Sequence, residues 1–354
     1  MKHRLFASLG ILALVTAIVS VAPVFVAAQA QSAAPAKAPA KAPAAKPWTI
    51  SRTPDGQPDL QGYWTLLSFT PLERPVKYGT REFFTDEETA AFYKAGVDHS
   101  YEFTFANAAE TPVYDATVFA LDAWQNGVKP NRRTSLIVDP PDGRLPSRTA
   151  EARARLAAHP LRADERETGT DSRVFRGPED LSLGERCLTF SGPPIPTGSS
   201  YNRDAYIVQG PGYVMIEYEW GSETRIIPLD GRPHISPRIR QWHGDPRGHW
   251  DGNTLVVETT NFRPESAYLG SNAATMRITE RFTRIDADTI EYKYTIDDPS
   301  TWTKPWSAII PMSKIDGPLF EYACTEGNNG AVNILEGARA KDRAAAEALK
   351  KGSK

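Results

Sequence analysis

The chain has little cysteine and almost no net charge. Its 354 residues include 2 Cys, and 41 Lys and Arg nearly balance 43 Asp and Glu, for a formal net charge of −2. Two cysteines are too few for a disulfide-dense scaffold, or for a zinc or iron–sulfur cluster built from thiolates. The near-neutral balance argues against a surface that binds nucleic acid, because such a surface needs a basic field.

The chain also lacks the short motifs that mark well-characterised catalytic and cofactor sites. It has no nucleophile elbow Gly-x-Ser-x-Gly, no His-Glu-x-x-His, no phosphate-binding loop and no Gly-x-Gly-x-x-Gly after a strand. Dehydrogenase and kinase functions are therefore not favoured, and the sequence predicts no cofactor. Hydrophobic residues make up 40% of the chain, which is enough for an ordinary globular core.

The N-terminus has the composition of an export signal followed by a tether. Lys2 to Arg4 are basic, residues 5–26 are almost entirely apolar, and Ala28-Gln29-Ala30 fits a signal-peptidase site. We predict a cleaved signal peptide at 1–30 and an Ala/Pro/Lys linker at 31–47, hence a periplasmic or secreted protein. The apolar stretch is also long enough to span a bilayer, so a retained anchor is the alternative. After cleavage we expect no stable membrane span.

Residues 48–354 are predicted to form a single β-rich domain in three parts. Residues 48–200 are irregular and rich in proline, and we expect them to wrap a core made elsewhere. Residues 201–328 are the predicted antiparallel β core. Residues 329–354 are a predicted C-terminal helical tail, charged enough to lie on the surface.

Two helices are predicted within the irregular segment. Thr85 and Glu88 have the spacing of a capping box, which opens a helix that reaches about Lys94. Residues 149–158 consist of good helix formers and stop before Pro160. Both helices are short, so the segment remains largely irregular.

From Tyr201 onward the hydrophobic pattern has period two. Alternating segments occur at 213–220, 276–285 and 289–296, and Gly, Asn and Asp turn signals lie between the strands. Short strands joined by tight turns form antiparallel meanders, and strongly curled meanders close into barrels. The predicted fold is mainly β: an antiparallel meander forming a lipocalin-like barrel or half-barrel, with an irregular Pro-rich N-terminal half, a few short helices and a C-terminal helix.

Side chains suited to ligand binding are concentrated in residues 225–261. This segment holds five arginines, two tryptophans and three of the 6 histidines. Guanidinium, indole and imidazole groups together can hold a carboxylate-bearing or sugar-like ligand. The alternative is a structural loop whose arginines pair with carboxylates such as Asp230, Asp245 and Asp251. We predict that the segment lines one cavity, with these ligand-binding residues: Arg225, Arg232, Arg240, Trp242, Arg247, Trp250 and Asn261.

The same segment contains metal-ligating residue types. His243-x-Asp245 and His249-x-Asp251 bring two imidazoles and two carboxylates within nine positions, which suits zinc or a similar ion. Residues 247–250 are, however, predicted to enter a strand, which leaves His243 across a loop from His249 and Asp251. No metal site is therefore predicted.

Two glutamates on predicted strands are candidates for acid–base chemistry. Glu258 lies within a strand, and Glu280 lies on the apolar face of another. A carboxylate that faces a core must be paired or have a raised pKa, as general acids do. The predicted catalytic residues are His234 as the acid–base group, with Glu258 or Glu280 as its partner. The alternative is a buried structural pair of one of these glutamates with Arg225 or Arg281.

The two cysteines, Cys187 and Cys324, can form a disulfide in an oxidising compartment. A loop that long would restrict the unfolded chain by about 4–5 kcal/mol on a chain-entropy estimate. The alternative is two buried thiols that lie too far apart to join. Neither cysteine has a base beside it in sequence, so neither is predicted to be a nucleophile.

Five longer segments carry a resemblance to known proteins: TPDGQPDLQGYW, IIPLDGRPH, GDPRGHWDGNTLVVETTNF, ITERFTRIDADTIEYKYTIDDPSTWTKPW and EYACTEGN. They resemble a large uncharacterised family of exported bacterial proteins with PDLxGxW and WDGxTLVVETTNF-type motifs, over most of the exported domain. The resemblance implies an exported protein with a β-rich core and supplies no catalytic assignment. Thr325 stands after Cys324 where the family pattern often has His, which weakens any mechanism that needs a base there.

Two functions from different classes are compatible with these residues. The first is an exported protein that binds a small acidic, aromatic or carbohydrate-like ligand in a cavity lined by Arg, His and Trp. The second is a cofactor-independent lyase, isomerase or hydrolase that uses His/Glu acid–base chemistry at the same site, with arginine stabilising an enolate or oxyanion. A third interpretation is an envelope protein whose Arg/Trp cluster packs loops. In the first two, the expected partner is a small molecule and not a nucleic acid.

Overall fold

One antiparallel sheet dominates the computed structural model, which describes residues 48–110, 127–158, 175–190, 193, 202–266 and 268–352. The predicted signal peptide (1–30) and linker (31–47) lie outside the described residues. Trp48–Lys354 group together as one unit, distinct from Met1–Pro47.

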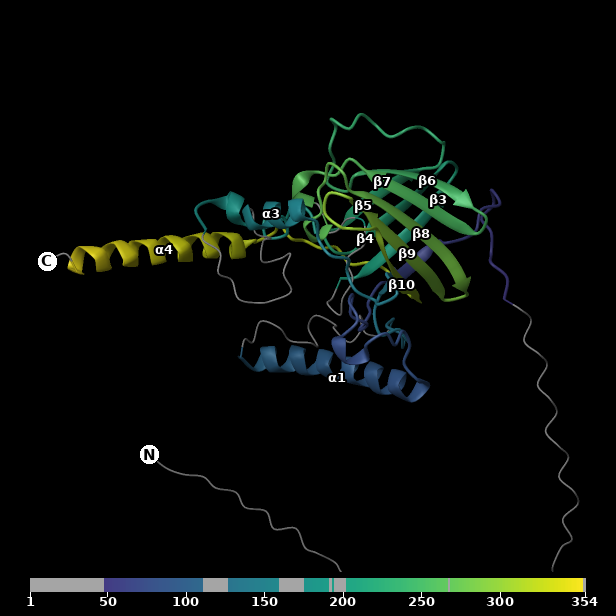
Figure 1. The fold of residues 1–354 in the computed structure, drawn as a ribbon, viewed down its shortest axis with the longest axis horizontal. Helices are drawn as coiled ribbons and strands as arrows, with labels where there is room; N and C mark the ends of the chain where they lie inside the picture. Colours follow the sequence, from purple (N-terminus) through teal and green to yellow (C-terminus); the bar gives the residue numbers. More distant parts are fainter. Residues whose placement is uncertain are drawn as a thin grey trace, which may run out of the picture. The chain divides into compact units, whose positions relative to one another are not determined.

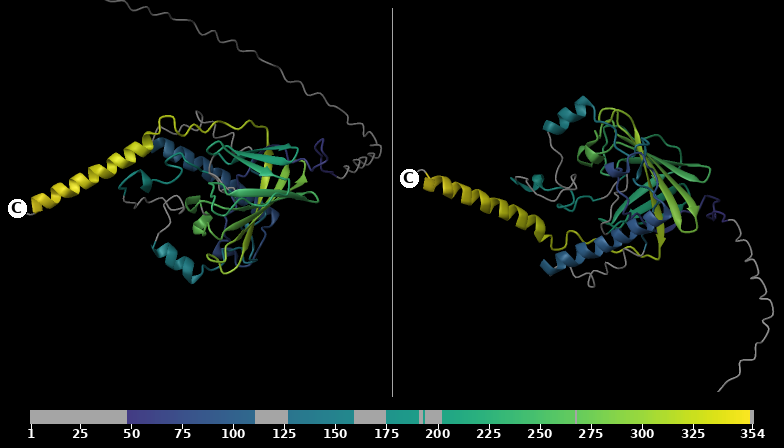
Figure 2. Two further views of the ribbon diagram at one scale, coloured as in Figure 1. Left: turned by 90° about the horizontal axis from the view of Figure 1, so that it is seen from above. Right: turned by 60° about the horizontal axis from the view of Figure 1, so that its bottom comes forward.

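Ten strands of the described chain belong to this sheet, in the order β5-β4-β3-β1-β10-β9-β8-β7-β6, with β2 paired to β10. Every paired neighbour runs antiparallel. Figure 1 and Figure 2 show the strands twisting together as one curved layer. The strands are β1 (Gly62–Thr65), β2 (Ile137–Asp139), β3 (Asp204–Gly210), β4 (Tyr213–Tyr218), β5 (Glu223–Pro228), β6 (Asp245–Asp251), β7 (Thr254–Thr260), β8 (Arg277–Asp286), β9 (Thr289–Asp297) and β10 (Trp306–Ile315).

The mainly β fold and the antiparallel meander are confirmed, but the sheet is not closed into a barrel. Its edges are β5 and β6, and no ladder of paired residues joins these two strands in the described chain. The edges nevertheless approach each other at Gly248 of β6. A Cβ there would lie 2.7 Å from side-chain carbons of Ile227 and Leu229, so this close approach requires glycine.

The predicted alternation of buried and exposed positions is present in the meander. Ile278, Glu280 and Phe282 of β8 are all fully buried, as are Tyr292 and Tyr294 of β9. Side chains two residues apart share a face of a strand, so these five belong to the core face of the sheet. Glu280 is therefore a carboxylate inside an otherwise apolar face, as the sequence predicted.

The expectation that residues 48–200 only wrap the core is wrong in one respect. β1 comes from this segment and lies in the middle of the sheet, between β3 and β10. Its Trp64 is fully buried, and the indole Nε1 donates a 3.0 Å hydrogen bond to the carbonyl of Leu60. A strand of four residues gives too short an alternation to be recognised in a proline-rich sequence.

Aromatic side chains fill the core face of the sheet. Tyr292 lies between Phe282 and Tyr294, with ring centroids 4.7 and 5.7 Å away, and Trp306 lies 5.8 Å from Tyr294. All four are fully buried. These rings therefore fill this part of the core face with closely packed side chains.

Three helices of at least two turns accompany the sheet in the described residues: α1 (Asp86–Glu110), α3 (Ala150–Ala158) and α4 (Asn329–Gly352). The capping box opens α1 as predicted, since Glu88 N donates to Thr85 Oγ1 at 3.2 Å and Thr85 N donates to Glu88 Oε2 at 2.9 Å. α1 continues well beyond Lys94, where the sequence predicted its end. α3 and the C-terminal helix α4 lie where they were predicted. Short 3-10 turns occur at Val76–Tyr78, Pro178–Asp180, Pro264–Ser266 and Tyr268–Gly270.

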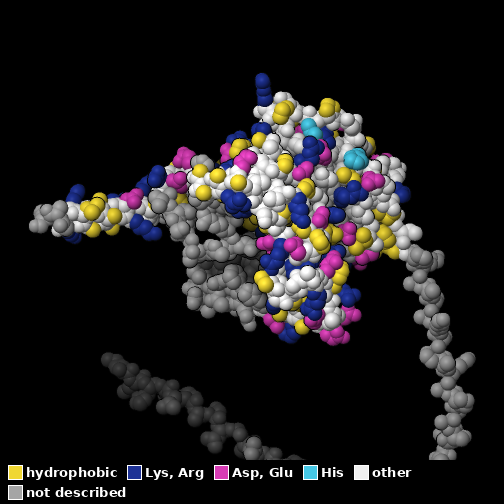
Figure 3. Space-filling model, viewed as in Figure 1, with side chains coloured by type: hydrophobic (Ala, Val, Ile, Leu, Met, Phe, Trp, Pro, Cys, Tyr) yellow, Lys and Arg dark blue, Asp and Glu magenta, His cyan; other side chains and the backbone are white. Residues whose placement is uncertain are grey.

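The described surface mixes charges of both signs. Figure 3 shows Lys and Arg interspersed with Asp and Glu over the visible face, with histidines among them. The near-zero net charge of the chain therefore also holds locally on this face. Among the helices of the described residues, none combines the length and the apolar character that crossing a bilayer requires.

Candidate functional site

An open cleft of about 630 Å³ lies beside edge strand β5. Strand β5 forms one wall of the cleft. The opposite wall belongs to the segment between β5 and β6, residues 229–244, which we call the wall segment. Leu188 and Thr189, which follow Cys187, and Arg263, which follows β7, complete the lining. Its volume lies in the range of small-molecule binding sites. The lining residues are Leu188, Thr189, Glu223, Thr224, Arg225, Ile226, Arg240, Gln241, Trp242, His243, Gly244, Pro246 and Arg263.

Asn261 holds the wall segment against the end of β7. Its Nδ2 donates to the carbonyls of Ile235 and Ser236, both at 3.1 Å, and its own carbonyl accepts a 3.0 Å hydrogen bond from Gln241 N. Arg263 N then donates to Gln241 O at 2.9 Å. Asn261 has a φ of 60°, in the left-handed region that asparagine tolerates better than most residues. Asn261 therefore positions the wall from outside the cleft.

Two guanidinium groups and an indole lie along this wall. Arg240 Nη1 donates to the carbonyl of Ala273 at 2.7 Å, and Arg240 has no carboxylate partner among the described residues. Arg263 lies 4.2 Å from the centre of the Trp242 ring and also pairs with Glu265 at 3.3 Å. The charge of Arg240 is thus uncompensated within the described chain, which makes it the anion-binding candidate.

His243 and Glu223 form an imidazole–carboxylate pair on the two walls of the cleft. Nε2 of His243 lies 2.9 Å from Glu223 Oε2 and 3.2 Å from the hydroxyl of Thr189. The other carboxylate oxygen, Oε1, accepts a 2.9 Å hydrogen bond from Phe190 N. Nδ1 of His243 makes no hydrogen bond to any described residue. The ring is therefore fixed on one side and leaves its second nitrogen available.

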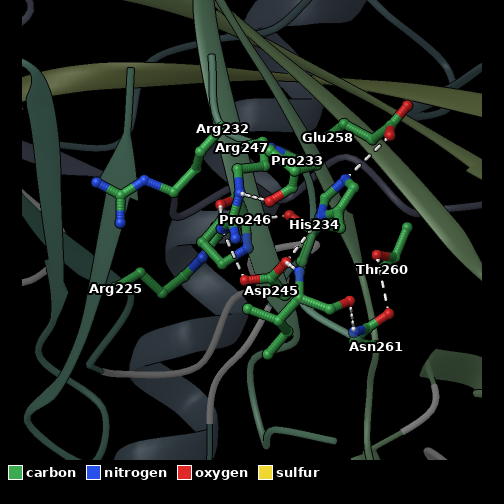
Figure 4. A network of polar contacts seen from close by, with 12 residues as sticks. Arg225, Arg232, Pro233, His234, Asp245, Pro246, Arg247, Glu258, Thr260 and Asn261 are labelled. Atoms are coloured by element: carbon green, nitrogen blue, oxygen red, sulfur yellow. Dashed lines mark hydrogen bonds and ion pairs between the residues drawn. The ribbon is translucent and has the colours of Figure 1, made fainter. Parts of the chain in front are cut away.

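His234, the predicted acid–base residue, is bound to carboxylates at both ring nitrogens (Figure 4). Nδ1 lies 2.8 Å from Asp245 Oδ2, and Nε2 lies 3.1 Å from Glu258 Oε1. Arg247 Nη1 donates to the second oxygen of Asp245 at 2.7 Å, and Arg277 lies 2.6 Å from Glu258. Because neither nitrogen is available, His234 joins the wall segment to β6 and β7 and does not face a ligand.

The electrostatics of Glu258 agree with this structural role. Burial by itself would raise the pKa of Glu258, but hydrogen bonds from Arg277 and His234 outweigh it and lower the pKa below its ordinary value. A carboxylate that stays ionised is a stable acceptor and a poor general acid. Glu258 therefore stays ionised and holds the wall segment against β7 through His234.

Glu280 and Arg225 form the buried ion pair that was the structural alternative. Arg225 Nη2 lies 2.6 Å from Glu280 Oε2, and the two side chains are 1% and 0% exposed. Arg225 also donates to the hydroxyls of Tyr218 at 2.9 Å and Thr259 at 3.2 Å. Burial by itself would lower the pKa of Arg225, but Glu280 raises it, so the guanidinium stays charged. Burial raises the pKa of Tyr218 to about 12.

Only part of the predicted set of site residues converges on one cleft. Of the predicted residues, Arg225, Arg240 and Trp242 line the cleft, and the catalytic candidates His234, Glu258 and Glu280 do not. Arg232 pairs with the neighbouring Asp230 and points away from His234 (Figure 4). Trp250 packs against the core, with a buried Nε1 that has no partner in the described chain. Arg247 and Asn261 hold the wall segment in place by hydrogen bonds to its backbone carbonyls.

Sequence reasoning missed the pairing of His243 with Glu223. His243 belonged to the predicted cluster and was weighed as a metal ligand, whereas Glu223 drew no attention. The two residues lie on different elements, and Phe190 and Thr189 come from a third segment. No sequence spacing connects three such segments. The only sequence feature that pointed to this pair was the presence of His243 among the arginines and tryptophans of residues 225–261.

A disulfide joins Cys187 to Cys324, which are 137 positions apart in sequence. It lies directly before Leu188 and Thr189, which line the cleft, and it ties this segment to the chain that leads into α4. Within the described residues, no group of three or more His, Cys, Asp and Glu side chains is arranged to hold a metal ion.

Two further carboxylates, those of Asp204 and Glu219, lie at the start of β3 and directly after β4. Burial raises the pKa of Asp204 to about 6, and the nearby Glu219 adds to the effect while a hydrogen bond with Thr65 opposes it. Burial also raises the pKa of Glu219, although Asn202 Nδ2 donates to it at 2.5 Å. Neither carboxylate lines the cleft, so we assign the pair to stability and not to the site.

Comparison of the chain with protein-family models, with curated proteins and with solved structures found no match. The resemblance to exported bacterial proteins therefore stays a prediction. The features of this chain that bear on function are the cleft, the uncompensated Arg240 and the pair of His243 with Glu223.

Proposed function

We propose that this is an exported, periplasmic or secreted protein that binds a small acidic and aromatic ligand in the cleft beside β5. The observation that carries the proposal is Arg240, which lines the cleft and whose guanidinium bonds to backbone carbonyls but has no carboxylate partner in the described chain. Trp242 lines the same wall, with Arg263 stacked on one side of its ring. A carboxylate on an aromatic ring would use both groups.

The shape of the sheet supports binding at an edge. We propose that the curved sheet is a lipocalin-like half-barrel whose inner face is closed by its aromatic core, so that the ligand lies where β5 and β6 fail to pair. The wall segment is held by Asn261 and by the contacts of His234 with Asp245 and Glu258. These contacts give the cleft its form before a ligand arrives, which reduces the entropic cost of binding.

The test uses benzoate as the probe and isothermal titration calorimetry of residues 48–354. Arg240→Gln should weaken benzoate binding by about tenfold or more, because a charge-assisted hydrogen bond is lost. Arg232→Gln is the matched control, since Arg232 is an exposed arginine outside the cleft. Equal effects of the two substitutions, or no benzoate binding by the unaltered protein, would refute the proposed site.

A second candidate function is the cofactor-independent lyase, isomerase or hydrolase. The observation that favours it is the His243–Glu223 pair, because a carboxylate that orients an imidazole is the arrangement of a general base. The base would then be His243 and not His234, whose two nitrogens are both engaged. Loss of a turnover activity in His243→Phe, with ligand binding retained, would distinguish this function from binding alone.

A further inference from the structure

We propose that the ligand is an aromatic hydroxy acid, and that its hydroxyl donates a hydrogen bond to Nδ1 of His243. The inference rests on the proposed binding function and adds the chemical class of the ligand. The inference depends on which nitrogen of His243 carries the proton and on whether the other nitrogen has a partner. It also uses Arg240 and Trp242, which line the same cleft.

Glu223 selects the tautomer of His243. A carboxylate is an acceptor only, so the Nε2 that lies 2.9 Å from Glu223 Oε2 must be the protonated nitrogen. Phe190 N donates to Oε1 of the same carboxylate at 2.9 Å, which fixes the orientation of the carboxylate plane. In the neutral ring the proton on Nε2 leaves a lone pair on Nδ1.

Nδ1 is then an acceptor without a protein donor. His243 lines the cleft, and no described residue donates to its Nδ1. Nδ1 is also absent from the buried polar atoms that lack a partner, so solvent reaches it. A ligand that places an O–H at this point satisfies the acceptor, whereas a ligand with a C–H there displaces water and leaves the acceptor unpaired.

The other groups of the cleft define the rest of the ligand. Arg240 offers a cation for a carboxylate, and Trp242, whose ring Arg263 covers on one side, brings an indole to the cleft for contact with an aromatic group. Arg263 stacks on Trp242 but is already paired with Glu265, so Arg240 is the better carboxylate partner. Carboxylate, ring and hydroxyl together describe an aromatic hydroxy acid. A site built to receive a hydroxyl discriminates strongly against the analogue that lacks it.

The experiment compares benzoate with 2-, 3- and 4-hydroxybenzoate by isothermal titration calorimetry at about pH 8. We expect at least one hydroxybenzoate to bind the unaltered protein about tenfold more tightly than benzoate. His243→Phe should remove this advantage, so that the variant binds benzoate and the hydroxybenzoates with equal affinity. His249→Phe is the control, because His249 is an exposed histidine of β6 outside the cleft.

Glu223→Gln provides a second, more conservative variant. Because Phe190 N holds the carbonyl oxygen of the new amide, its NH₂ group would face His243 Nε2 and donate to it. The proton of the ring must then move to Nδ1, which turns the acceptor into a donor. We expect the preference for the hydroxyl to disappear, and the ¹⁵N shifts of the imidazole to report the exchanged tautomer.

The outcomes separate this inference from the proposed function. If benzoate and all three hydroxybenzoates bind equally well, or if His243→Phe keeps the preference, the hydroxyl assignment is overturned while the binding function stands. If none of the four compounds binds, both are overturned. If Glu223→Gln exchanges the tautomer and still prefers the hydroxybenzoate, His243 is not the group that reads the hydroxyl.

Discussion

The buried pair of Arg225 with Glu280 offers the sharpest test of how this fold is held together. Their side chains are 1% and 0% exposed, and they join β5 to β8 across the core. Glu280 also accepts a 2.8 Å hydrogen bond from the hydroxyl of Tyr292, and Arg225 donates to Tyr218 at 2.9 Å. Every one of these groups lies in an apolar environment, where a missing partner is costly.

Glu280→Leu removes one charge and leaves the guanidinium of Arg225 buried without its counter-ion. Removing one partner of a buried ion pair costs about 3–5 kcal/mol of unfolding free energy. The double variant Arg225→Met with Glu280→Leu should recover most of that loss and lie within about 2 kcal/mol of the unaltered protein, because no uncompensated charge remains. The residual loss would come from the two tyrosine hydroxyls that lose a partner.

The next residue of β8 supplies the matched control. Arg281 pairs with Asp251 at 2.8 Å, but these side chains are 41% and 62% exposed. Arg281→Met should therefore cost less than about 1 kcal/mol. Urea denaturation of residues 48–354 measures these three variants together with the single variant Arg225→Met. A cost for Glu280→Leu as small as that for Arg281→Met, or a double variant as unstable as the sum of its single changes, would refute the reasoning.

Three further predictions address pH, the disulfide and the loop. Asp204, with a pKa raised from 3.8 to about 6, holds its proton more tightly when folded, so stability should fall by about 3 kcal/mol in total as the pH rises from about 3 to 7. Asp204→Asn should make that fall smaller in a urea titration series, leaving only the part that Glu219 contributes, whereas Asp297→Asn on the exposed end of β9 should preserve it. Replacing Cys187 and Cys324 by alanine should cost about 5 kcal/mol, given their separation of 137 residues, and a reductant should then have no further effect on the urea midpoint. His234→Ala leaves Asp245 and Glu258 without the imidazole between them and should speed amide hydrogen exchange in residues 235–244; unchanged exchange there would contradict the loop-holding role.

Several elements of the fold could be predicted from local sequence. The capping box at Thr85 and the period-two strands β4, β8 and β9 are all present in the structure. Each depends on neighbouring residues, whose spacing is visible in the sequence. The length of α1 and the central position of β1 were not predicted, because a helix end without a stop signal and a four-residue strand leave little local trace.

The candidate site shows the same division. The cluster of arginine, histidine and tryptophan in residues 225–261 was recognised by composition, and it does supply Arg240, Trp242 and His243 to the cleft. Composition did not reveal which histidine faces the cleft. That depends on carboxylates of other strands: Asp245 and Glu258 bind both nitrogens of His234, whereas Glu223 binds one nitrogen of His243.

The sequence by itself determined the alternation of the strands, the placing of a glutamate on an apolar face and the choice of residue types near the site. These properties follow from periods of two and from chemistry carried by single residues. Only the tertiary structure decided that the sheet stays open between β5 and β6, that Glu280 meets Arg225, and that His234 is enclosed while His243 keeps a nitrogen for the cleft. Contacts between segments far apart in the chain depend on how the sheet curves, and that curvature is a property of all its strands together.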